Sequence, residues 1–402
     1  MMNQQPPTQV VPLNEFGRRR VRPTVVIADD KPHIREFVRE ALEDMGFIVE
    51  DGGGDRLVNL TAGRSMDLVM LGLSAGGVAA AQALENLAAT GFDGQIMIFA
   101  PAEFPMVDAL YELGAQLGLK MLPLLPTPFS DGTLRHAVRG LAPQEPVALP
   151  TLDAALALRA GWLELWYQPK VDVRSLTIAG AEGLIRMRHP TWGIVPPANF
   201  LPDPHDPHFA ELSLFVMEQA AAHWHEFAAD HGHIELAINL PLTYFSDPLA
   251  IESLVLRLPQ HHAFEGLIVE INASDLAGNI ELAKSTARQL RYFNISLSID
   301  DLGADWPLLL EIGDCPFAEI KVDREFVHGL ADDRLKQTTC RSIIELADRL
   351  GARTVAEGVE TRADFVMARD LGFDLIQGFF FGKPTEAAKF ARRTLREPVK
   401  IN

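Results

Sequence analysis

At 402 residues the chain is long enough for two domains, each with a hydrophobic core of its own. Hydrophobic residues make up 48% of it, which is typical of folded globular proteins and argues against wholesale disorder. A formal charge of −18 excludes a broad basic face that could coat a nucleic-acid polymer, although a bound cation could still recruit a small anionic ligand. No apolar run is long enough to span a bilayer, and the N-terminus lacks the apolar core of a signal peptide. We therefore expect a cytoplasmic protein with no membrane segment.

The first part of the chain predicts a flexible arm followed by a small α/β domain. Residues 1–23 are polar and contain prolines and a basic run, which we expect to be solvated. In residues 24–140, short apolar runs alternate with segments of helical character, which predicts a doubly wound sheet. The first expected helix runs from Pro32 to Met45. The expected strands are Thr24–Ala28, Phe47–Glu50, Leu68–Leu71, Gln95–Ala100 and Lys120–Pro123.

A proline-rich stretch separates this domain from a larger one. Residues 141–151 carry prolines at positions 143, 146 and 150 and few helix formers, which is typical of an interdomain linker. The second domain is expected to cover residues 152–395 and to open with a helix over Leu152–Ala160. The only cysteines, Cys315 and Cys340, imply no disulfide framework.

The second domain repeats one pattern, a short apolar run that ends in a single acid, amide or base. Between most of these runs lie segments long enough for one helix and two turns. Alternating strands and helices over residues 152–395 predict a (β/α)₈ barrel of the TIM type. In such barrels the active-site residues lie at the C-terminal ends of the strands. The runs are Ala179–Glu182, Leu236–Asn239, Ile268–Glu270, Ile295–Asp301, Ile320–Lys321, Thr354–Glu357 and Leu375–Gln377.

The polar residues that end these runs indicate a reaction site. Five carboxylates, two amides and a lysine gathered on one rim are typical of a hydrolytic site that uses divalent metal ions. Neighbouring strand residues face opposite sides, so Asp300 and Asp301 can converge only if the strand ends between them. Gly303, just beyond, favours such an end.

In the first domain, the acidic pair Asp29–Asp30 follows the first strand directly, and a helix and further strands and helices follow the pair. This succession resembles the flavodoxin-like receiver domain of two-component response regulators. The resemblance implies a phospho-accepting aspartate at the end of the third strand, where this chain has Gly72, and Ala100 and Thr127 stand where a hydroxyl residue and a lysine are expected. Because glycine has no side chain to phosphorylate, we predict a degenerate receiver that provides surfaces for a dimer or a protein partner. Its acidic pair is then a strand-end cap or solvated turn rather than a remaining metal site.

The second domain carries a series of ordered motifs. They are Tyr167–Lys170, Ala181–Arg186, Arg188–Pro190, Ile238–Leu240, Val269–Ile271, Ile299–Asp301, Ile320–Asp323, Ala356–Thr361 and Gln377–Gly378. The series resembles the EAL domain of cyclic di-GMP phosphodiesterases, with Glu182–Leu184 in place of the tripeptide that names the family. The resemblance implies hydrolysis of cyclic di-GMP to linear pGpG by metal-activated water, in bacterial second-messenger signalling.

The resemblance also implies roles for individual residues. Mg²⁺ or Mn²⁺ would be held by Glu182, Asn239, Glu270, Asp300, Asp301 and Glu357. The catalytic residues would be Lys321, Glu357 and Glu182, with Lys321 orienting the attacking water or stabilising phosphate charge. The substrate contacts would be Gln168, Leu184, Arg186, Asp323, Glu360 and Gln377. A homodimer is expected as well.

Two departures from the family bear on activity. After Glu270 the family has a threonine and then a second glutamate that braces a mobile loop, whereas this chain has Asn272 and Ala273. The braced loop itself is altered, with the bulkier sequence Leu302–Leu308. We therefore expect weakened binding of the second metal ion and a weak or conditional activity. The alternative is a catalytically silent protein that binds cyclic di-GMP as an effector or regulates through protein interaction.

Overall fold

The structure is a computed structural model. It describes residues 22–52, 66–73, 77–101, 103–104, 106–142, 149–203, 206, 208–231, 234–276, 279–303, 306–313 and 315–394. The predicted arm up to residue 21, most of the predicted linker, and residues 304 and 305 of the altered loop lie outside the described residues. The chain divides into two compact units. The first unit lies within Met1–Pro150 and His189–Val195, and the second lies within Thr151–Arg188 and Pro196–Asn402.

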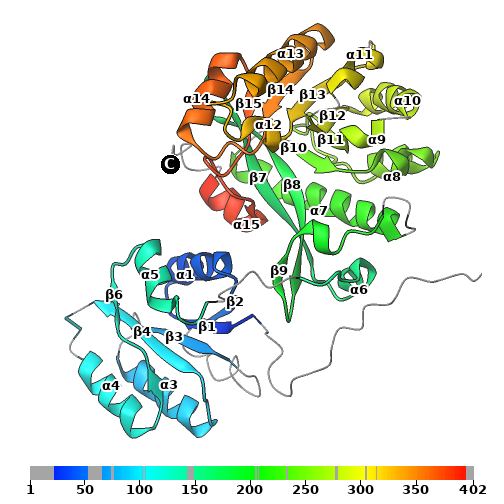
Figure 1. Cartoon of the computed structure of the whole chain (residues 1–402). Coiled ribbons are helices and arrows are strands. Elements are labelled where there is room, and N and C mark those ends of the chain that lie inside the picture. Colours follow the sequence, from blue (N-terminus) through cyan, green and yellow to red (C-terminus); the bar gives the residue numbers. More distant parts are fainter. Residues whose placement is uncertain are drawn as a thin grey trace, which may run out of the picture. The chain divides into compact units, whose positions relative to one another are not determined.

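The first unit is built on a parallel sheet. Its strands are β1 (Thr24–Ala28), β2 (Ile48–Gly52), β3 (Leu68–Gly72), β4 (Gln95–Pro101), β5 (Lys120–Met121) and β6 (Leu125–Thr127). Their order in the sheet is β2-β1-β3-β4-β5, and β6 also pairs with β4 (Figure 1). Every pairing is parallel, so a helix or another crossover must connect successive strands.

Helices cover both faces of this sheet, as predicted. They are α1 (Pro32–Asp44), α3 (Gly77–Ala89), α4 (Val107–Gln116) and α5 (Asp131–Val138). Successive side chains of a strand point to opposite faces, and the two faces of β1 accordingly belong to different cores. Val26 packs in the core that contains residues of α3 and α4, whereas Val25 packs in the core that contains residues of α1 and α5.

Two predicted strands of this unit end elsewhere than expected. The second begins at Ile48 rather than Phe47, because the Phe47 N–H bonds to the Leu42 carbonyl and closes helix α1. The fifth stops at Met121, and a separate strand, β6, follows it. Pro123 lies between them, and a proline has no N–H with which to continue a ladder.

The end of β3 has no room for a side chain. A Cβ added to Gly72 would lie 1.8 Å from Asp29 Oδ2 and 2.7 Å from a ring carbon of Phe99. Asp29 is 2% exposed, and its Oδ1 accepts a 2.7 Å hydrogen bond from the Lys31 N–H. The Asp29 carboxylate therefore caps the turn after β1 and occupies the space in front of Gly72.

This packing predicts that Gly72→Ala destabilises the first unit. The added methyl group must displace the Asp29 carboxylate or the Phe99 ring, and overpacking of this kind costs about 1–3 kcal/mol. Urea unfolding of the full chain measures the change. Gly140→Ala is the matched control, because a Cβ there meets nothing within 4 Å. Equal stabilities of the two variants would contradict the prediction.

The second unit is a closed barrel. Its ring contains β7 (Leu163–Asp172), β8 (Ile178–His189), β10 (Glu235–Asn239), β11 (Leu267–Asn272), β12 (Ile295–Leu302), β13 (Phe317–Val322), β14 (Arg353–Ala356) and β15 (Leu375–Ile376). Neighbours pair in the order β7-β15-β14-β13-β12-β11-β10-β8, and a β7–β8 pairing closes the ring (Figure 1). The short strand β16 (Thr385–Glu386) pairs with β7, and β9 (Gly193–Val195) belongs to the stretch His189–Val195 of the first unit.

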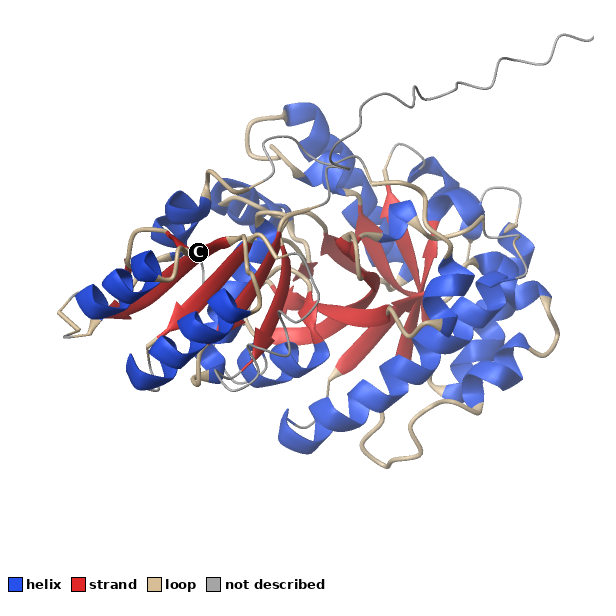
Figure 2. Cartoon of the chain, turned by 90° about the horizontal axis from the view of Figure 1, so that it is seen from below, coloured by secondary structure: helices blue, strands red, loops and turns tan. Residues whose placement is uncertain are grey.

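Helices follow most of these strands and lie outside them (Figure 2). They are α6 (Ala154–Arg159), α7 (His208–His231), α8 (Ala250–Val255), α9 (Ala273–Leu276), α10 (Ile280–Leu290), α11 (Leu309–Ile312), α12 (Arg324–Val327), α13 (Arg334–Leu350), α14 (Arg362–Leu371) and α15 (Ala387–Lys389). The opening helix begins two residues later than predicted, because the Asp153 side chain accepts from the Leu156 N–H and caps it. No helix in the described part of the chain is both long and apolar enough to cross a bilayer.

The barrel departs from a wholly parallel (β/α)₈ ring at one strand. β7 runs antiparallel to both neighbours, β8 and β15, whereas the other pairings of the ring are parallel. Antiparallel strands can be joined by a tight turn, and residues 173–177 are enough to connect β7 to β8. The only sign of this reversal in the sequence is the short connection between β7 and β8, which does not by itself fix the direction of a strand.

Candidate active site

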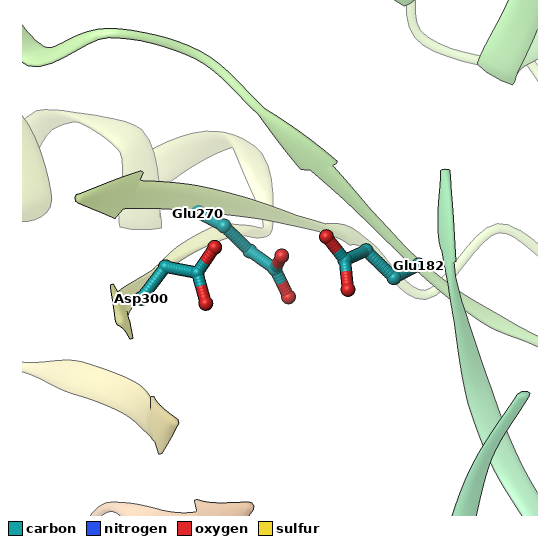
Figure 3. Close-up of side chains that lie close together, drawn as sticks. All are labelled: Glu182, Glu270 and Asp300. Atoms are coloured by element: carbon teal, nitrogen blue, oxygen red, sulfur yellow. The ribbon is translucent and has the colours of Figure 1, made fainter. Parts of the chain in front are cut away.

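Three buried carboxylates face one another near the C-terminal ends of the barrel strands. Glu182 comes from β8, Glu270 from β11 and Asp300 from β12, and their side chains converge (Figure 3). One oxygen of each lies within 4.8 Å of the others, and the residues are 4%, 1% and 9% exposed. Oxygen ligands in such a group are the kind that hard divalent cations prefer.

A second group of carboxylates shares Asp300 with the first. It contains Asp300, Asp301 and Glu357, again with one oxygen of each within 4.8 Å of the others. Glu357 directly follows β14. The donor set of both groups is oxygen only, so each group could hold a hard divalent cation.

The convergence of Asp300 and Asp301 arises differently from the prediction. The expectation that the strand ends between them is wrong, since β12 continues to Leu302. Instead Asp301 adopts a left-handed conformation with φ of 53°, and the register with β13 shifts between Ile299 and Leu302. This local irregularity turns the Asp301 side chain away from the alternation of a regular strand.

Lys321 lies at the centre of the acidic residues. Its Nζ is 3.1 Å from Glu182 Oε2 and 2.8 Å from oxygens of Glu270, Asp300 and Glu357. The lysine side chain is 1% exposed, so these contacts are shielded from water. One ammonium group thus faces four carboxylates, and a deficit of positive charge remains at the site.

A second buried lysine, Lys170, forms an ion pair with Glu270. Lys170 Nζ lies 2.8 Å from Glu270 Oε1 and 2.6 Å from Glu319 Oε2. Arg353 continues this network with a 2.7 Å hydrogen bond to Glu319 Oε1. Each oxygen of Glu270 therefore has a lysine partner, Lys170 on one side and Lys321 on the other.

The environment moves the pKa values of these acids in opposite directions. Burial raises the pKa of Glu182 to about 7, with the neighbouring Glu270 carboxylate acting in the same direction. Burial also raises the pKa of Asp300, and that of Glu357 well above its usual value. Burial alone would raise the pKa of Glu270, but Lys170 and Lys321 together lower it to about 2. Burial opposes the charge of Lys321, yet the surrounding carboxylates hold its pKa well above the usual value.

Three amide side chains connect the acids to the wall of the barrel. Asn239 Nδ2 donates to Glu182 Oε1 over 2.7 Å. Gln377 Nε2 donates to Gln168 Oε1 over 3.1 Å and also to Glu182, while Gln168 Nε2 donates to the Gly382 carbonyl over 3.0 Å. Among the described residues, no group donates to the buried Gln377 Oε1.

An open cavity of about 440 Å³ lies above this site. Carboxylates and amides line one part of it, and the rest is mostly apolar. The polar lining includes Gln168, Glu182, Asn239, Asp300, Asp301, Glu357, Glu360 and Gln377, and the apolar lining includes Leu184, Ile185, Pro197, Leu201, Val216 and Phe379. A cavity with an apolar wall and a few convergent polar groups is typical of a small-molecule site.

Comparison with protein families identifies the second unit. The model of the EAL domain matches residues 152–384, which is more than half of the chain. The chain belongs to the EAL-domain family. The matched residues lie inside the predicted range 152–395, so the prediction of an EAL domain is confirmed.

Several characterised EAL proteins are similar to this chain. The bifunctional diguanylate cyclase/cyclic di-GMP phosphodiesterase MucR of Pseudomonas aeruginosa is 31% identical over 58% of this chain and 35% of its own length. The cyclic di-GMP phosphodiesterase RocR of the same organism is 27% identical over 91% of this chain and 97% of its own length. The solved structure of the PaMucR phosphodiesterase in complex with c-di-GMP has a TM-score of 0.55 at 30% identity, covering 59% of this chain and 97% of that chain. The chain spans only 35% to 40% of the length of three of its curated relatives.

The EAL fold brings most of the predicted site residues together. The predicted metal ligands, Lys321, Gln168, Leu184, Glu360 and Gln377 all contact the two acidic groups or line the cavity. Glu182 lies inside β8 rather than at a strand end, since β8 continues to His189. Arg186 and Asp323 are not among the lining residues. Arg186 donates to the Ile185 carbonyl, and Asp323 caps α12 by accepting from the Glu325 N–H.

Some residues of the EAL site were missed in the sequence. Arg324 lines the cavity, and its guanidinium lies 3.8 Å from Glu360. Lys170 ends the motif Tyr167–Lys170, from which no function of this lysine was predicted. Glu319 carries a usable signal, because it precedes Lys321 by two residues and must face the same side of its strand.

Proposed function

We propose that this EAL protein is a phosphodiesterase that hydrolyses cyclic di-GMP to linear pGpG with the help of Mg²⁺ or Mn²⁺. The observation that carries the proposal is the pair of carboxylate groups that share Asp300 beside Lys321. Hydrolysis of a phosphodiester needs charge neutralisation at the phosphate and an acidified water, and divalent cations would supply both when bound. Glu182, Asn239, Glu270 and Asp300 would hold one ion, and Asp300, Asp301 and Glu357 the other.

The protein's own groups would position the reactants. Glu357 would accept the proton of the attacking water, because burial raises its pKa and so makes its carboxylate a stronger base. Lys321 Nζ would donate to that water or to a phosphate oxygen as negative charge develops. In this scheme Glu357 provides proton transfer and Lys321 provides charge stabilisation.

The cavity wall supports a nucleotide substrate. Gln377 Oε1 is a buried acceptor without a donor among the described residues, so it can receive an N–H from a bound ligand. The apolar side chains around Phe379 can cover a base, and Arg324 is the cation in the cavity lining. For Arg186 and Asp323, which do not line the cavity, substrate contact stays a prediction from the family resemblance.

A second candidate is a silent effector that binds cyclic di-GMP without hydrolysing it, or a regulator that acts through protein interaction. Ala273 supports it, because this small buried side chain cannot replace the expected bracing carboxylate. The first unit supports it as well, since its parallel sheet in the order β2-β1-β3-β4-β5 is compatible with a receiver but Gly72 offers no group to phosphorylate. We propose that this unit is a degenerate receiver with a protein partner, that the chain forms a homodimer, and that it acts in the cytoplasm.

The two candidates are separated by a turnover assay. Purified full-length chain is incubated with cyclic di-GMP and Mg²⁺ or Mn²⁺, and the linear dinucleotide is quantified by chromatography. We expect slow hydrolysis that Glu182→Ala lowers by about 10²–10³-fold, because a lost cation ligand removes several kcal/mol of transition-state stabilisation. Glu281→Ala, at an exposed acid of α10, is the control and should leave the rate unchanged.

The outcomes of this assay are distinct. Tight binding of cyclic di-GMP with no turnover in either metal would support the silent effector. Turnover that survives Glu182→Ala would reject the proposed metal site while keeping the activity.

A further inference from the structure

Asp301 needs support to hold its carboxylate beside Asp300 and Glu357. Its φ of 53° lies in the left-handed region, which is sparsely populated by residues other than glycine. Without a partner, the residue would gain by relaxing toward a regular strand. That change would send its side chain to the opposite side from Asp300.

The partner of Asp301 is Asn272, the last residue of β11. Asn272 Nδ2 donates to Asp301 Oδ2 over 2.9 Å. In the ladder between β11 and β12, Asn272 pairs with Asp300, so its side chain starts directly beside the acidic pair. The contact joins two neighbouring strands at the cavity edge.

The amide of Asn272 is itself oriented by Ser274. Asn272 Oδ1 accepts from the Ser274 N–H over 2.9 Å and from Ser274 Oγ over 2.6 Å. Because a backbone N–H can only donate, the oxygen of the amide must face Ser274 and the NH₂ group must face Asp301. The hydrogen bond to Asp301 is therefore directed rather than fortuitous.

We infer that Asn272, oriented by Ser274, is a positioning residue that holds Asp301 in its left-handed conformation and so maintains the second cation site. This inference rests on the proposed function, because it assumes that Asp300, Asp301 and Glu357 bind a cation. A hydrogen-bonding partner behind a metal ligand typically changes metal affinity about 10–100-fold.

The test measures Mn²⁺ binding to the metal-free full-length chain without substrate, by calorimetry and by electron paramagnetic resonance. We expect two ions per wild-type chain. Asn272→Ala should weaken the second ion about 10–100-fold and leave the first within about twofold. Ser274→Ala should weaken the second ion in the same direction but less, and Asp301→Ala serves as the reference for its loss.

Asn279→Ala is the matched control, because Asn279 is an exposed asparagine seven residues along the chain from Asn272 whose side chain donates to the Asp275 carbonyl and, among the described residues, to no proposed ligand. It should leave both ions unchanged. If Asn272→Ala binds two ions as tightly as the wild type, or if Asn279→Ala weakens the second ion equally, the inference is overturned while the proposed function stands. If the wild-type chain binds no Mn²⁺, the proposed function fails and the inference fails with it.

Discussion

Replacing Lys321 by methionine is expected to lower the free energy of unfolding of the metal-free protein by about 3–5 kcal/mol near pH 8, because it removes one partner of buried ion pairs. The variant keeps the length of the side chain but leaves Glu182, Asp300 and Glu357 without their ammonium partner. Saturating Mn²⁺ should stabilise the variant more than the wild type, since the cation replaces the missing positive charge and binding stabilises the folded state. Turnover should stay lost, because methionine cannot donate a proton to water or phosphate.

Chemical unfolding with and without Mn²⁺ measures both effects. Lys336→Met is the control, because the ammonium group of this half-buried lysine bonds to the His328 carbonyl and, in the described structure, to no carboxylate, so its loss should change stability little. A metal-free Lys321→Met variant as stable as the wild type would show that the four carboxylates do not depend on the ammonium group. The inference that Lys321 stabilises these carboxylates would then be wrong.

Mn²⁺ affinity is expected to rise at least tenfold per pH unit from pH 5 to about 7, because binding displaces the proton of Glu182. The sign follows from Glu182. Its pKa of about 7 means that the carboxyl holds a proton at pH 6 and has lost it at pH 8, and only the ionised form binds a cation. Glu270 adds no slope in this range, since its pKa of about 2 keeps it ionised throughout.

Calorimetric titrations at several pH values, in buffers with different ionisation enthalpies, measure the affinity and the protons released. Asp300 and Glu357 also have raised pKa values and can steepen the dependence. Glu182→Gln should release about one proton fewer, because glutamine has none to lose. A flat affinity between pH 5 and 7 in the wild type would contradict the prediction.

The order of strands and the identity of the acids could be read from the sequence because both depend on local patterns. A series of apolar runs, each followed by a polar residue, is typical of barrel strands that carry polar side chains at the rim. Glu270, Lys321 and Glu357 were found in this way. The same pattern placed Glu182 at a strand end, which is wrong, because a strand can continue past the rim of the barrel as β8 does.

Contacts between distant segments could not be read in the same way. Lys170 and Glu319 are 149 residues apart, and nothing local marks them as partners. From the sequence, Ala273 indicated only the loss of a bracing carboxylate. The hydrogen bond from Asn272 to Asp301 could not be predicted, because it exists only once β11 and β12 lie side by side. In the first unit, the sequence showed that Gly72 stands where a phospho-accepting aspartate is expected. Only the packing showed that Asp29 and Phe99 fill the space that a side chain at Gly72 would need.

By itself, the sequence determined the kind of site, since the chemistry of carboxylates, amides and lysine is a property of the side chains. The tertiary structure decided how they act together. It placed one ammonium among four carboxylates, raised and lowered their pKa values through burial and charge, and turned Asp301 toward Asp300 by a left-handed residue. These effects depend on distances of a few ångströms between strands, and such distances are set only when the barrel closes.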